Sequence, residues 1–177
     1  MTRFLCISGK AQNGKDTTAA MFYEELTKRG YRVLLTHYAD LLKYICRSLF
    51  GWDGEKDEAG RTLLQRVGTD CIRRQKPSYW VDFLTGIVRM FPDEWDFVIV
   101  ADVRFPNELT GIKGAGFPMT HIRVTRANFV SLLTAEQQAH PSETALDHTL
   151  ADWGILNGTL EELREKVNFI CDAEGFV

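Results

Sequence analysis

The sequence lacks the features that mark secreted, disulfide-stapled or membrane-spanning proteins. Its four cysteines, Cys6, Cys46, Cys71 and Cys171, lie far apart and form no CxxC pair. This spacing argues against a disulfide framework or a zinc site, and we expect the four thiols to be buried small hydrophobes in a reducing compartment. No apolar run approaches membrane-spanning length, and residues 1–3 lead straight into a predicted strand. We therefore expect no signal peptide, no membrane partner and a cytoplasmic location.

The chain also lacks a large excess of charge of either sign. Its net charge is -3 at pH 7, which argues against a surface dominated by nonspecific nucleic-acid binding but leaves room for a local basic groove. Hydrophobic residues make up 45% of the chain and charged residues 25%, as in ordinary globular proteins. No repeat, low-complexity tract or linker divides the sequence. We therefore expect one domain over residues 1–177.

Apolar segments with strand character alternate with segments of helical periodicity. The predicted strands cover residues 4–8, 31–38, 96–102, 119–125 and 153–157. The predicted helices cover residues 17–29, about 40–51, 61–74, about 77–90, 107–115 and 159–169, and Gly68 marks a bend or a close backbone contact within the third. Residues 52–60 and most of 126–145 are polar and only weakly periodic. This alternation predicts an α/β fold with a parallel sheet covered on both faces.

The most informative stretch is Gly-Lys-Ala-Gln-Asn-Gly-Lys-Asp-Thr at residues 9–17, directly after the first predicted strand. Glycines let the backbone curl so that its N–H groups face phosphate oxygens, and the helix that follows adds its positive end. Lys15 supplies a cation for the β- and γ-phosphates. A glycine-rich turn that binds nothing is the alternative. The pattern predicts a triphosphate site made of Gly9, Ala11, Asn13, Gly14, Lys15, Asp16 and Thr17.

Carboxylates near this loop are candidate metal ligands. A hydroxyl residue normally follows the lysine and holds Mg²⁺, but here Asp16 takes that position and Thr17 comes next. Asp102 ends the third predicted strand, and ligands of doubly wound sheets sit at the carboxyl ends of strands. A carboxylate there suits Mg²⁺, held directly or through water. The candidate metal residues are Asp16, Thr17 and Asp102, with a plain cap of the next turn as the alternative for Asp102.

A second set of polar residues predicts an acceptor side. Asp40 follows the second strand, where a carboxylate orients an acceptor, acts as a base if the acceptor is a hydroxyl, or simply caps the next helix. Lys43 lies one turn later and faces the same cleft. Arg61, Gln65 and Arg73 lie on the next helical segment. Taken singly they are ordinary surface residues, but as a set they provide the cations that phosphoryl transfer needs.

Two further arginines follow strands. Arg104 lies two residues after Asp102, where it faces a substrate phosphate or forms a surface ion pair. Arg126 leaves the fourth strand and enters a polar segment that suits a lid over the triphosphate, excluding water. The segment His140-Pro-Ser-Glu143 matches no zinc spacing, and we expect His140 to have a positioning or capping role.

Seven motifs occur together in one order along the chain. They are residues 9–17, His37-Tyr-Ala-Asp-Leu-Leu-Lys43, Leu64-Gln-Arg-Val-Gly-Thr-Asp70, Asp102-Val-Arg-Phe-Pro-Asn-Glu108, Ile122-Arg-Val-Thr-Arg126, His140-Pro-Ser-Glu143 and Asn157-Gly-Thr-Leu-Glu-Glu-Leu163. This combination resembles the phage and bacterial deoxynucleoside monophosphate kinase family, a branch of the P-loop kinases related to adenylate kinase. The stretch from Asp102 to Glu108 is its most specific element.

The resemblance implies a three-layer fold with a five-stranded parallel sheet, acceptor-binding helices at about 40–92 and a lid at about 126–147. It implies ATP and Mg²⁺, and transfer of the γ-phosphoryl group to a deoxynucleotide. The catalytic candidates are then Lys15, Asp40, Asp102, Arg104 and Arg126. The substrate-binding candidates are Asp40, Lys43, Arg61, Gln65, Arg73 and Arg104. The location implied is a bacterial cytoplasm or that of a phage-infected host cell, and the oligomeric state stays open, with a homodimer among the options.

Two other functions stay open. The family also resembles phage kinases that phosphorylate 5-hydroxymethyluracil within DNA. A hydroxyl acceptor must lose a proton, so Asp40 would act as its base, and a basic rim containing Arg73, Arg74 and Lys76 would face the DNA. A nucleotide-binding module without kinase activity is the third option. The arginine cluster argues against that module, because a switch needs no acceptor-phosphate site.

Overall fold

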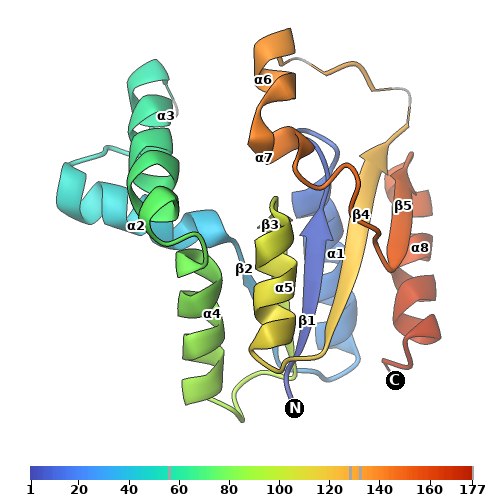
Figure 1. Cartoon of the computed structure of the whole chain (residues 1–177). Helices are drawn as coiled ribbons and strands as arrows, with labels where there is room; N and C mark the ends of the chain where they lie inside the picture. The colour runs from blue at the N-terminus through green and yellow to red at the C-terminus, as the bar shows by residue number, and fades with distance from the viewer. Residues whose placement is uncertain (56, 128, 132, 177) are drawn as a thin grey trace.

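A computed structural model describes residues 1–55, 57–127, 129–131 and 133–176 of the chain. It contains one parallel sheet with the strand order β2-β3-β1-β4-β5. The strands are β1 (Arg3–Ser8), β2 (Val33–Thr36), β3 (Phe97–Val103), β4 (Met119–Arg126) and β5 (Trp153–Asn157). All five carboxyl ends therefore lie at one edge of the sheet, the upper edge in Figure 1. The predicted five-stranded parallel sheet is confirmed.

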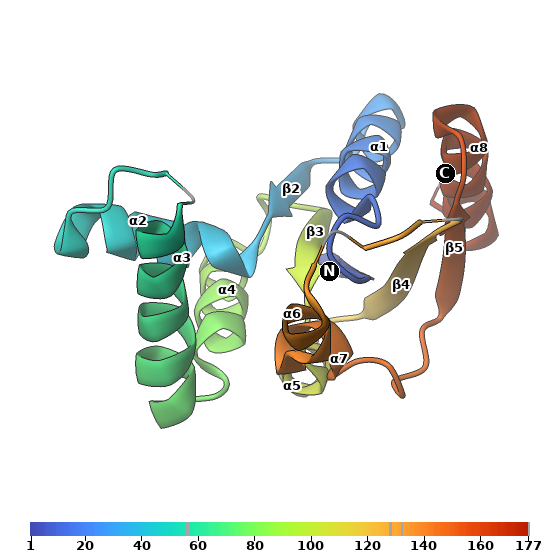
Figure 2. The same ribbon diagram turned by 90° about the horizontal axis from the view of Figure 1, so that it is seen from above.

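Helices cover both faces of this sheet, as the view from above shows (Figure 2). One face carries α1 (Lys15–Lys28) and α8 (Leu160–Ala173), which also contact each other. The opposite face carries α4 (Tyr79–Met90) and α5 (Pro106–Gly114). The molecule is thus the three-layer α/β fold that the alternating pattern predicts.

Alternation along the strands divides the core between these two layers. On β1, Leu5 and Ile7 pack toward α1 and α8, in the cluster that holds the fully buried Phe22. Phe4 and Cys6 point the other way, toward α4 and α5. Successive side chains of a strand face opposite sides of a sheet, so a strand covered on both faces is apolar throughout. This is why residues 4–7 form an uninterrupted apolar run.

Two groups of helices rise beyond the carboxyl edge of the sheet (Figure 1). On one side are α2 (Tyr38–Phe50), α3 (Glu58–Gln65) and the π-helical segment η1 (Arg66–Arg73). On the other side are the short helices α6 (Ala135–Ala139) and α7 (Pro141–Thr144). The bend predicted at Gly68 coincides with η1, where a Cβ would lie 2.6 Å from Leu42 Cδ2 of α2. The backbone of η1 at Gly68 therefore packs closely against the Leu42 side chain, and a larger residue there would require that side chain to shift.

Several boundaries differ from the predicted ones for local reasons. The second strand is shorter than predicted, because His37 caps α2 and the helix begins at Tyr38. The predicted loop at 52–60 contains the start of α3, since the Asp57 side chain accepts a hydrogen bond from Gly60 N. The predicted acceptor region and lid include residues 56, 128 and 132, which lie outside the described residues.

The expectation for the cysteines is wrong at one position. Cys6, Cys46 and Cys171 are buried, but Cys71 is exposed on η1. Its neighbours Val67 and Gly68 take the buried positions of that segment, so the side chain of Cys71 falls on the outer surface. All four thiols are free, as the spacing predicts.

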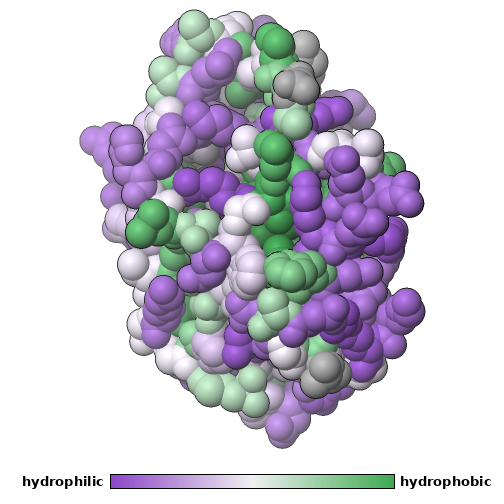
Figure 3. Space-filling view, turned by 90° about the vertical axis from the view of Figure 1, so that its right-hand side faces the viewer, coloured by the Kyte–Doolittle hydropathy of each residue, from purple (hydrophilic) through white to green (hydrophobic). Residues whose placement is uncertain are grey.

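The face formed around β5 and α8 is mostly hydrophilic, with a narrow band of hydrophobic side chains along its middle (Figure 3). Because β5 pairs only with β4, it is an edge strand. Its exposed residues are Gly154 and Leu156, and Lys166 of α8 donates a hydrogen bond to Leu156 O at 2.6 Å. A short edge strand with a lysine on its backbone is poorly suited to pairing with another chain. No helix within the described residues is long and apolar enough to cross a bilayer.

The contact between α4 and α5 gives a first test of the packing. A Cβ at Gly111 would lie 2.7 Å from Val81 Cγ1, whereas a Cβ at Gly114 of the same helix meets nothing within 4 Å. We expect Gly111→Ala to lower the free energy of unfolding by about 1–3 kcal/mol through overpacking. We expect Gly114→Ala to be neutral or to stabilise by about 0.5 kcal/mol. Urea unfolding measures both, and equal stability of the two variants would contradict a tight α4–α5 contact.

Candidate functional site

The carboxyl edge of the sheet borders a cavity of about 680 Å³. The loop after β1 contributes Ala11 to its wall, and the end of β3 contributes Asp102 and Arg104. Residues of α2, α3 and η1 line one side, and residues of α6 and α7 line the other. Six of the predicted site residues therefore meet here, namely Ala11, Arg61, Gln65, Arg73, Asp102 and Arg104.

The glycine-rich loop has the tight shape that its sequence predicts. Gly9 and Gly14 have φ values of 151° and 90°, which side chains rarely adopt. Space is also closed at both positions, because a Cβ would lie 2.3 Å from Val124 O at Gly9 and 2.2 Å from Asn157 Nδ2 at Gly14. The first N–H groups of α1, which begins at Lys15, point into this loop without helical partners. The loop therefore offers backbone donors to an anion.

Lys15 is held inside the loop. Its side chain is buried, and Nζ donates a hydrogen bond to Lys10 O at 2.9 Å. Burial lowers the pKa of Lys15, the charge of Arg104 lowers it further, and the carboxylate of Glu143 acts in the opposite direction. A bound triphosphate would add negative charge at this point and favour the protonated amine.

Asn157 supports the loop from the neighbouring strand end. This residue ends β5 and is buried, and its Nδ2 donates a hydrogen bond to Asn13 O at 3.1 Å. The motif that begins at Asn157 is part of the family resemblance, but the residue was not predicted as a site residue. The signal that could have found it is topological, because β5 lies beside β4 and ends at the same edge as the loop.

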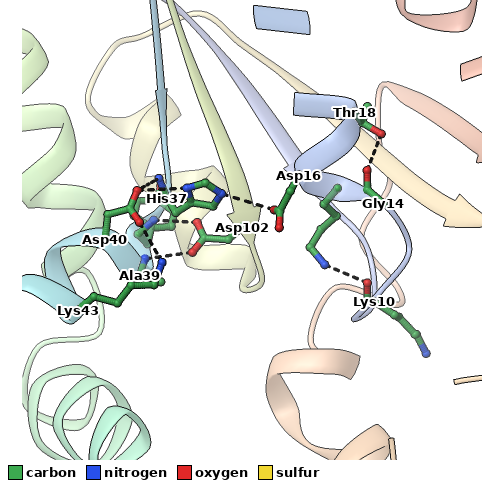
Figure 4. A network of polar contacts seen from close by, with 11 residues as sticks. Lys10, Gly14, Asp16, Thr18, His37, Ala39, Asp40, Lys43 and Asp102 are labelled. Atoms are coloured by element: carbon green, nitrogen blue, oxygen red, sulfur yellow. Dashed lines mark hydrogen bonds and ion pairs between the residues drawn. The ribbon is translucent and has the colours of Figure 1, made fainter. Parts of the chain in front are cut away.

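Asp102 ties β3 to the start of α2. Its Oδ1 accepts a hydrogen bond from Tyr38 N at 2.7 Å, and its Oδ2 accepts one from Ala39 N at 3.0 Å (Figure 4). Burial raises the pKa of Asp102, and the two N–H donors partly offset that effect. Asp102 thus accepts the first N–H groups of α2, whereas the capping alternative predicted that it would cap the turn after β3. Each carboxylate oxygen has further acceptor capacity, so capping and a metal role are compatible.

Asp16 and Thr17 lie at the start of α1. The Asp16 side chain is 83% exposed, and its Oδ1 lies 3.5 Å from His37 Nε2 (Figure 4). Thr17 is exposed, whereas Thr18 is buried and its Oγ1 donates to Gly14 O. Within the described residues no three His, Cys, Asp or Glu side chains gather as a metal site. These residues fit a cation held by one or two carboxylates and the phosphates themselves, as is usual for Mg²⁺.

Asp40 and Lys43 lie outside the large cavity. Asp40 Oδ2 accepts the N–H of His37, and Oδ1 pairs with Lys43 Nζ at 3.1 Å (Figure 4). Partial burial acts to raise the pKa of Asp40, but Lys43 and His37 outweigh it and the pKa is lowered. The carboxylate lines a smaller groove of about 300 Å³ between α2 and α4. This geometry matches the capping alternative for Asp40.

Glu108 organises the floor of the cavity. It is 2% exposed, and Oε1 accepts a hydrogen bond from Arg73 Nη2 at 2.8 Å. Its Oε2 accepts the N–H groups of Arg104 and Phe105 at 2.7 and 3.0 Å. The Arg73 guanidinium also stacks 4.2 Å from the centre of the Phe105 ring. Glu108 ends the most specific predicted motif, yet it was not itself predicted as a site residue.

Two buried polar atoms near this floor have no hydrogen-bond partner within the described part of the chain. They are Arg73 Nη1 and Tyr38 OH. Both residues line the cavity, and both atoms can donate hydrogen bonds. Buried donors without partners are unfavourable, so these two atoms are candidates to bind an anionic ligand. Tyr38 is a further residue that sequence reasoning missed.

Arg104 reaches across to α7. Its Nη1 donates to Glu143 Oε1 at 2.6 Å and to Ser142 O at 3.3 Å. The other oxygen of Glu143 accepts the N–H of Ala11, in the glycine-rich loop, at 2.7 Å. His140 Nδ1 accepts a hydrogen bond from Ser142 N and so caps α7, which is the role that the sequence predicts for His140.

The two arginines of β4 differ in environment. Arg123 Nη2 donates to Leu146 O and Thr149 O, and so holds the segment that follows α7. Arg126 is exposed at the strand end, with its guanidinium 5.1 Å from the Phe129 ring centre. It does not line the large cavity. Its predicted catalytic role stays a prediction.

A family model described as deoxynucleotide monophosphate kinase matches residues 43–167, more than half of the chain. The match begins after the glycine-rich loop, so the loop does not contribute to it. The loop and the family match are therefore independent indications of a nucleotide kinase. The matched range includes most of the acceptor-side helices and the stretch from Asp102 to Glu108. No curated protein sequence matches the chain significantly.

Solved structures show the same fold at low sequence identity. An APS kinase from Mycobacterium tuberculosis, in complex with AMPPNP and APS, is 11% identical with a TM-score of 0.55, covering 97% of this chain and 98% of that one. A sugar kinase from Janibacter sp. is 14% identical with a TM-score of 0.52, covering 97% and 95%. A protein named APE1195 is 16% identical with a TM-score of 0.52, covering 98% and 95%.

The Asn157 contact yields a test of the loop. We expect Asn157→Ala to lower the free energy of unfolding by about 1–2 kcal/mol, because a buried hydrogen bond is lost and Asn13 O is left unsatisfied. The loop would then hold phosphate less well, and we expect triphosphate affinity to fall about tenfold. Urea unfolding and titration calorimetry measure the two effects. Asn168→Ala on α8 serves as a control, and unchanged affinity in Asn157→Ala would rule out support of the loop by this residue.

Proposed function

The chain belongs to the deoxynucleotide monophosphate kinase family, and we propose that it transfers the γ-phosphoryl group of ATP to a deoxynucleoside monophosphate. The observation that carries this proposal is the position of the arginine-lined cavity beside the glycine-rich loop. Ala11 of the loop and Arg104 of the cavity lie in the same wall. A phosphate donor on the loop and an acceptor in the cavity would therefore meet at Arg104.

On the donor side, the loop N–H groups and Lys15 would bind the β- and γ-phosphates of ATP. Asp16 and Asp102 are the residues that would hold Mg²⁺, with Thr17 as a further candidate. When bound, the cation would neutralise charge on the phosphates. Asn157 would keep the loop in its binding shape through Asn13.

On the acceptor side, the cavity has the size of a small-ligand pocket. Arg61, Arg73 and Arg104 would bind the phosphate of the acceptor, with Gln65 beside them. Apolar side chains of the same cavity, including Leu42, Leu64 and Trp80, offer a surface for sugar and base. A nucleoside monophosphate suits such a cavity, because its phosphate would bind the arginines and its sugar and base would contact the apolar side chains.

The chemistry requires no general base for such an acceptor. A monophosphate is already ionised and attacks the γ-phosphorus directly, so the protein's contribution is positioning and charge stabilisation. Arg104 would lie between donor and acceptor, where charge develops. The segment 126–147, with Arg126, would cover the reacting groups and limit hydrolysis by water.

A hydroxyl acceptor, such as hydroxymethyluracil in DNA, is less well supported. It would need a base, and the lowered pKa of Asp40 makes that carboxylate a weak one. Asp40 also lies outside the large cavity and is engaged by His37 and Lys43. These contacts favour the monophosphate acceptor over the DNA acceptor.

The activity itself is tested by replacing Lys15. We expect Lys15→Ala to slow phosphoryl transfer by roughly 100-fold or more with an unchanged fold, because the γ-phosphate loses its cation. Lys28→Ala, at the exposed far end of the same helix, is the control. The assay offers labelled ATP with each deoxynucleoside monophosphate, and with duplex DNA containing thymine or hydroxymethyluracil. Full activity of Lys15→Ala, or label on DNA alone, would overturn the proposal.

Asp40→Asn separates the two acceptor classes. With a monophosphate acceptor we expect the turnover rate to stay within about threefold of the wild type, and the free energy of unfolding to fall by about 1 kcal/mol through the weakened cap. Asp82→Asn is a matched control, since Asp82 pairs with Lys76 and lies outside the described cavities. If turnover fell by roughly 100-fold or more in Asp40→Asn alone, Asp40 would be identified as a base and a hydroxyl acceptor would be favoured.

A further inference from the structure

Glu143 makes an unusual bridge at the proposed transfer site. One carboxylate oxygen accepts a backbone N–H of the glycine-rich loop at 2.7 Å, from Ala11. The other accepts the guanidinium of Arg104 at 2.6 Å. The side chain is only 7% exposed, although it comes from the short helix α7 at the surface. These are the two kinds of donor that a transferring phosphoryl group would need.

The contacts of Glu143 are those of an anion in the loop. Backbone N–H groups of a glycine-rich loop are anion donors, and a carboxylate is the protein's own equivalent of a phosphate oxygen pair. Its charge is also felt by Lys15, whose pKa it acts to raise, against the larger lowering effects of burial and Arg104. Glu143 thus binds the Ala11 N–H and Arg104 and influences Lys15, three of the groups that would face the γ-phosphate.

Its position also connects two cavities. Arg104, Ser142 and Glu143 line the large cavity on the acceptor side, and the same three residues line a smaller one of about 190 Å³ beside Gly9 and Asn13. Glu143 occupies the Ala11 N–H and the Arg104 guanidinium, the groups at which a phosphate on the loop would meet an acceptor in the large cavity. Phosphoryl transfer requires donor and acceptor atoms in line and in contact, so Glu143 must release both groups for the reaction.

Several contacts hold the backbone on either side of Glu143, so rotation of its side chain is the smallest movement that frees the loop. His140 caps α7, and Arg123 holds the carbonyl groups of Leu146 and Thr149. Lys10 and Asp147 add an exposed ion pair between the loop and the same segment, at 3.3 Å. Rotation of one glutamate side chain would clear the loop without displacing the backbone.

We propose that Glu143 is an internal substitute for the γ-phosphoryl group, which ATP must displace to bind and which, once displaced, releases Arg104 to the transferring phosphate. This inference rests on the proposed function. It adds that ATP binding and the availability of Arg104 are coupled through one carboxylate. It also means that Glu143 weakens ATP binding, and that removing its negative charge should strengthen that binding.

The test compares Glu143→Gln with the wild type in binding of ATP and of inorganic tripolyphosphate, without acceptor. Glutamine keeps the shape but loses the charge that competes with phosphate, so we expect both ligands to bind about tenfold more tightly. Glu161→Gln is the control for long-range electrostatics, because it removes one negative charge from an exposed residue in the first turn of α8, which contacts neither the glycine-rich loop nor Arg104. We expect Glu161→Gln to change affinity less than about twofold.

Other outcomes contradict the inference in distinct ways. Unchanged or weaker binding in Glu143→Gln, with a lower turnover rate, would make Glu143 a fixed positioning residue for Arg104. An equal gain in Glu161→Gln would show that the effect is general charge repulsion, and would overturn the proposal that Glu143 specifically replaces the phosphate. Failure of the wild type to bind ATP at all would instead overturn the proposed function. Calorimetry on the folded full chain, with thermal unfolding as a fold check, distinguishes these results.

Discussion

The hydrogen bonds from Tyr38 N and Ala39 N to Asp102 set the geometry of the whole site. Asp102 lies near the carboxyl end of β3, and the two N–H groups belong to the first turn of α2, which leads to the acceptor side. A buried carboxylate is costly unless its oxygens are hydrogen-bonded, and a helix N-terminus compensates it with donors and a favourable dipole. The interaction therefore fixes the direction of α2 relative to the glycine-rich loop.

Glu108, in the first turn of α5, is a second buried carboxylate whose charge is compensated by hydrogen bonds. Its buried charge is matched by Arg73 and by two backbone N–H groups of the turn after β3. This pairing holds Arg73 against Phe105 and leaves Nη1 without a partner at the cavity, among the residues that the structure describes. A buried ion pair contributes little net stability, but it places a guanidinium where a solvated arginine would otherwise move freely. The role of the Arg73–Glu108 pair is then to hold the Arg73 guanidinium at the cavity.

The sequence predicted the sheet and the loop because both depend on local patterns. Uninterrupted apolar runs such as residues 4–7 identify buried strands, and glycine spacing identifies the loop. It could not predict contacts between distant residues, such as Asn157 with Asn13 or Glu143 with Ala11. No periodicity reports a partner at such a distance along the chain. Cys71 shows the same limit, since the face it occupies depends on how η1 packs on α2.

Several contacts of the site share one feature, which is that each pairs a cationic side chain with an acceptor in the protein. Three of the groups that would face phosphate already have a protein acceptor, with Lys15 on Lys10 O, Arg104 on Glu143 and Arg73 on Glu108. Cations clustered without such partners would repel one another and destabilise the fold. Both carboxylate acceptors are buried, but Glu108 belongs to α5, which packs on the sheet, whereas Glu143 comes from the short helix α7 beyond the carboxyl edge. A phosphate can therefore replace Glu143 without disturbing the core, whereas Glu108 must stay in place for Arg73 to act.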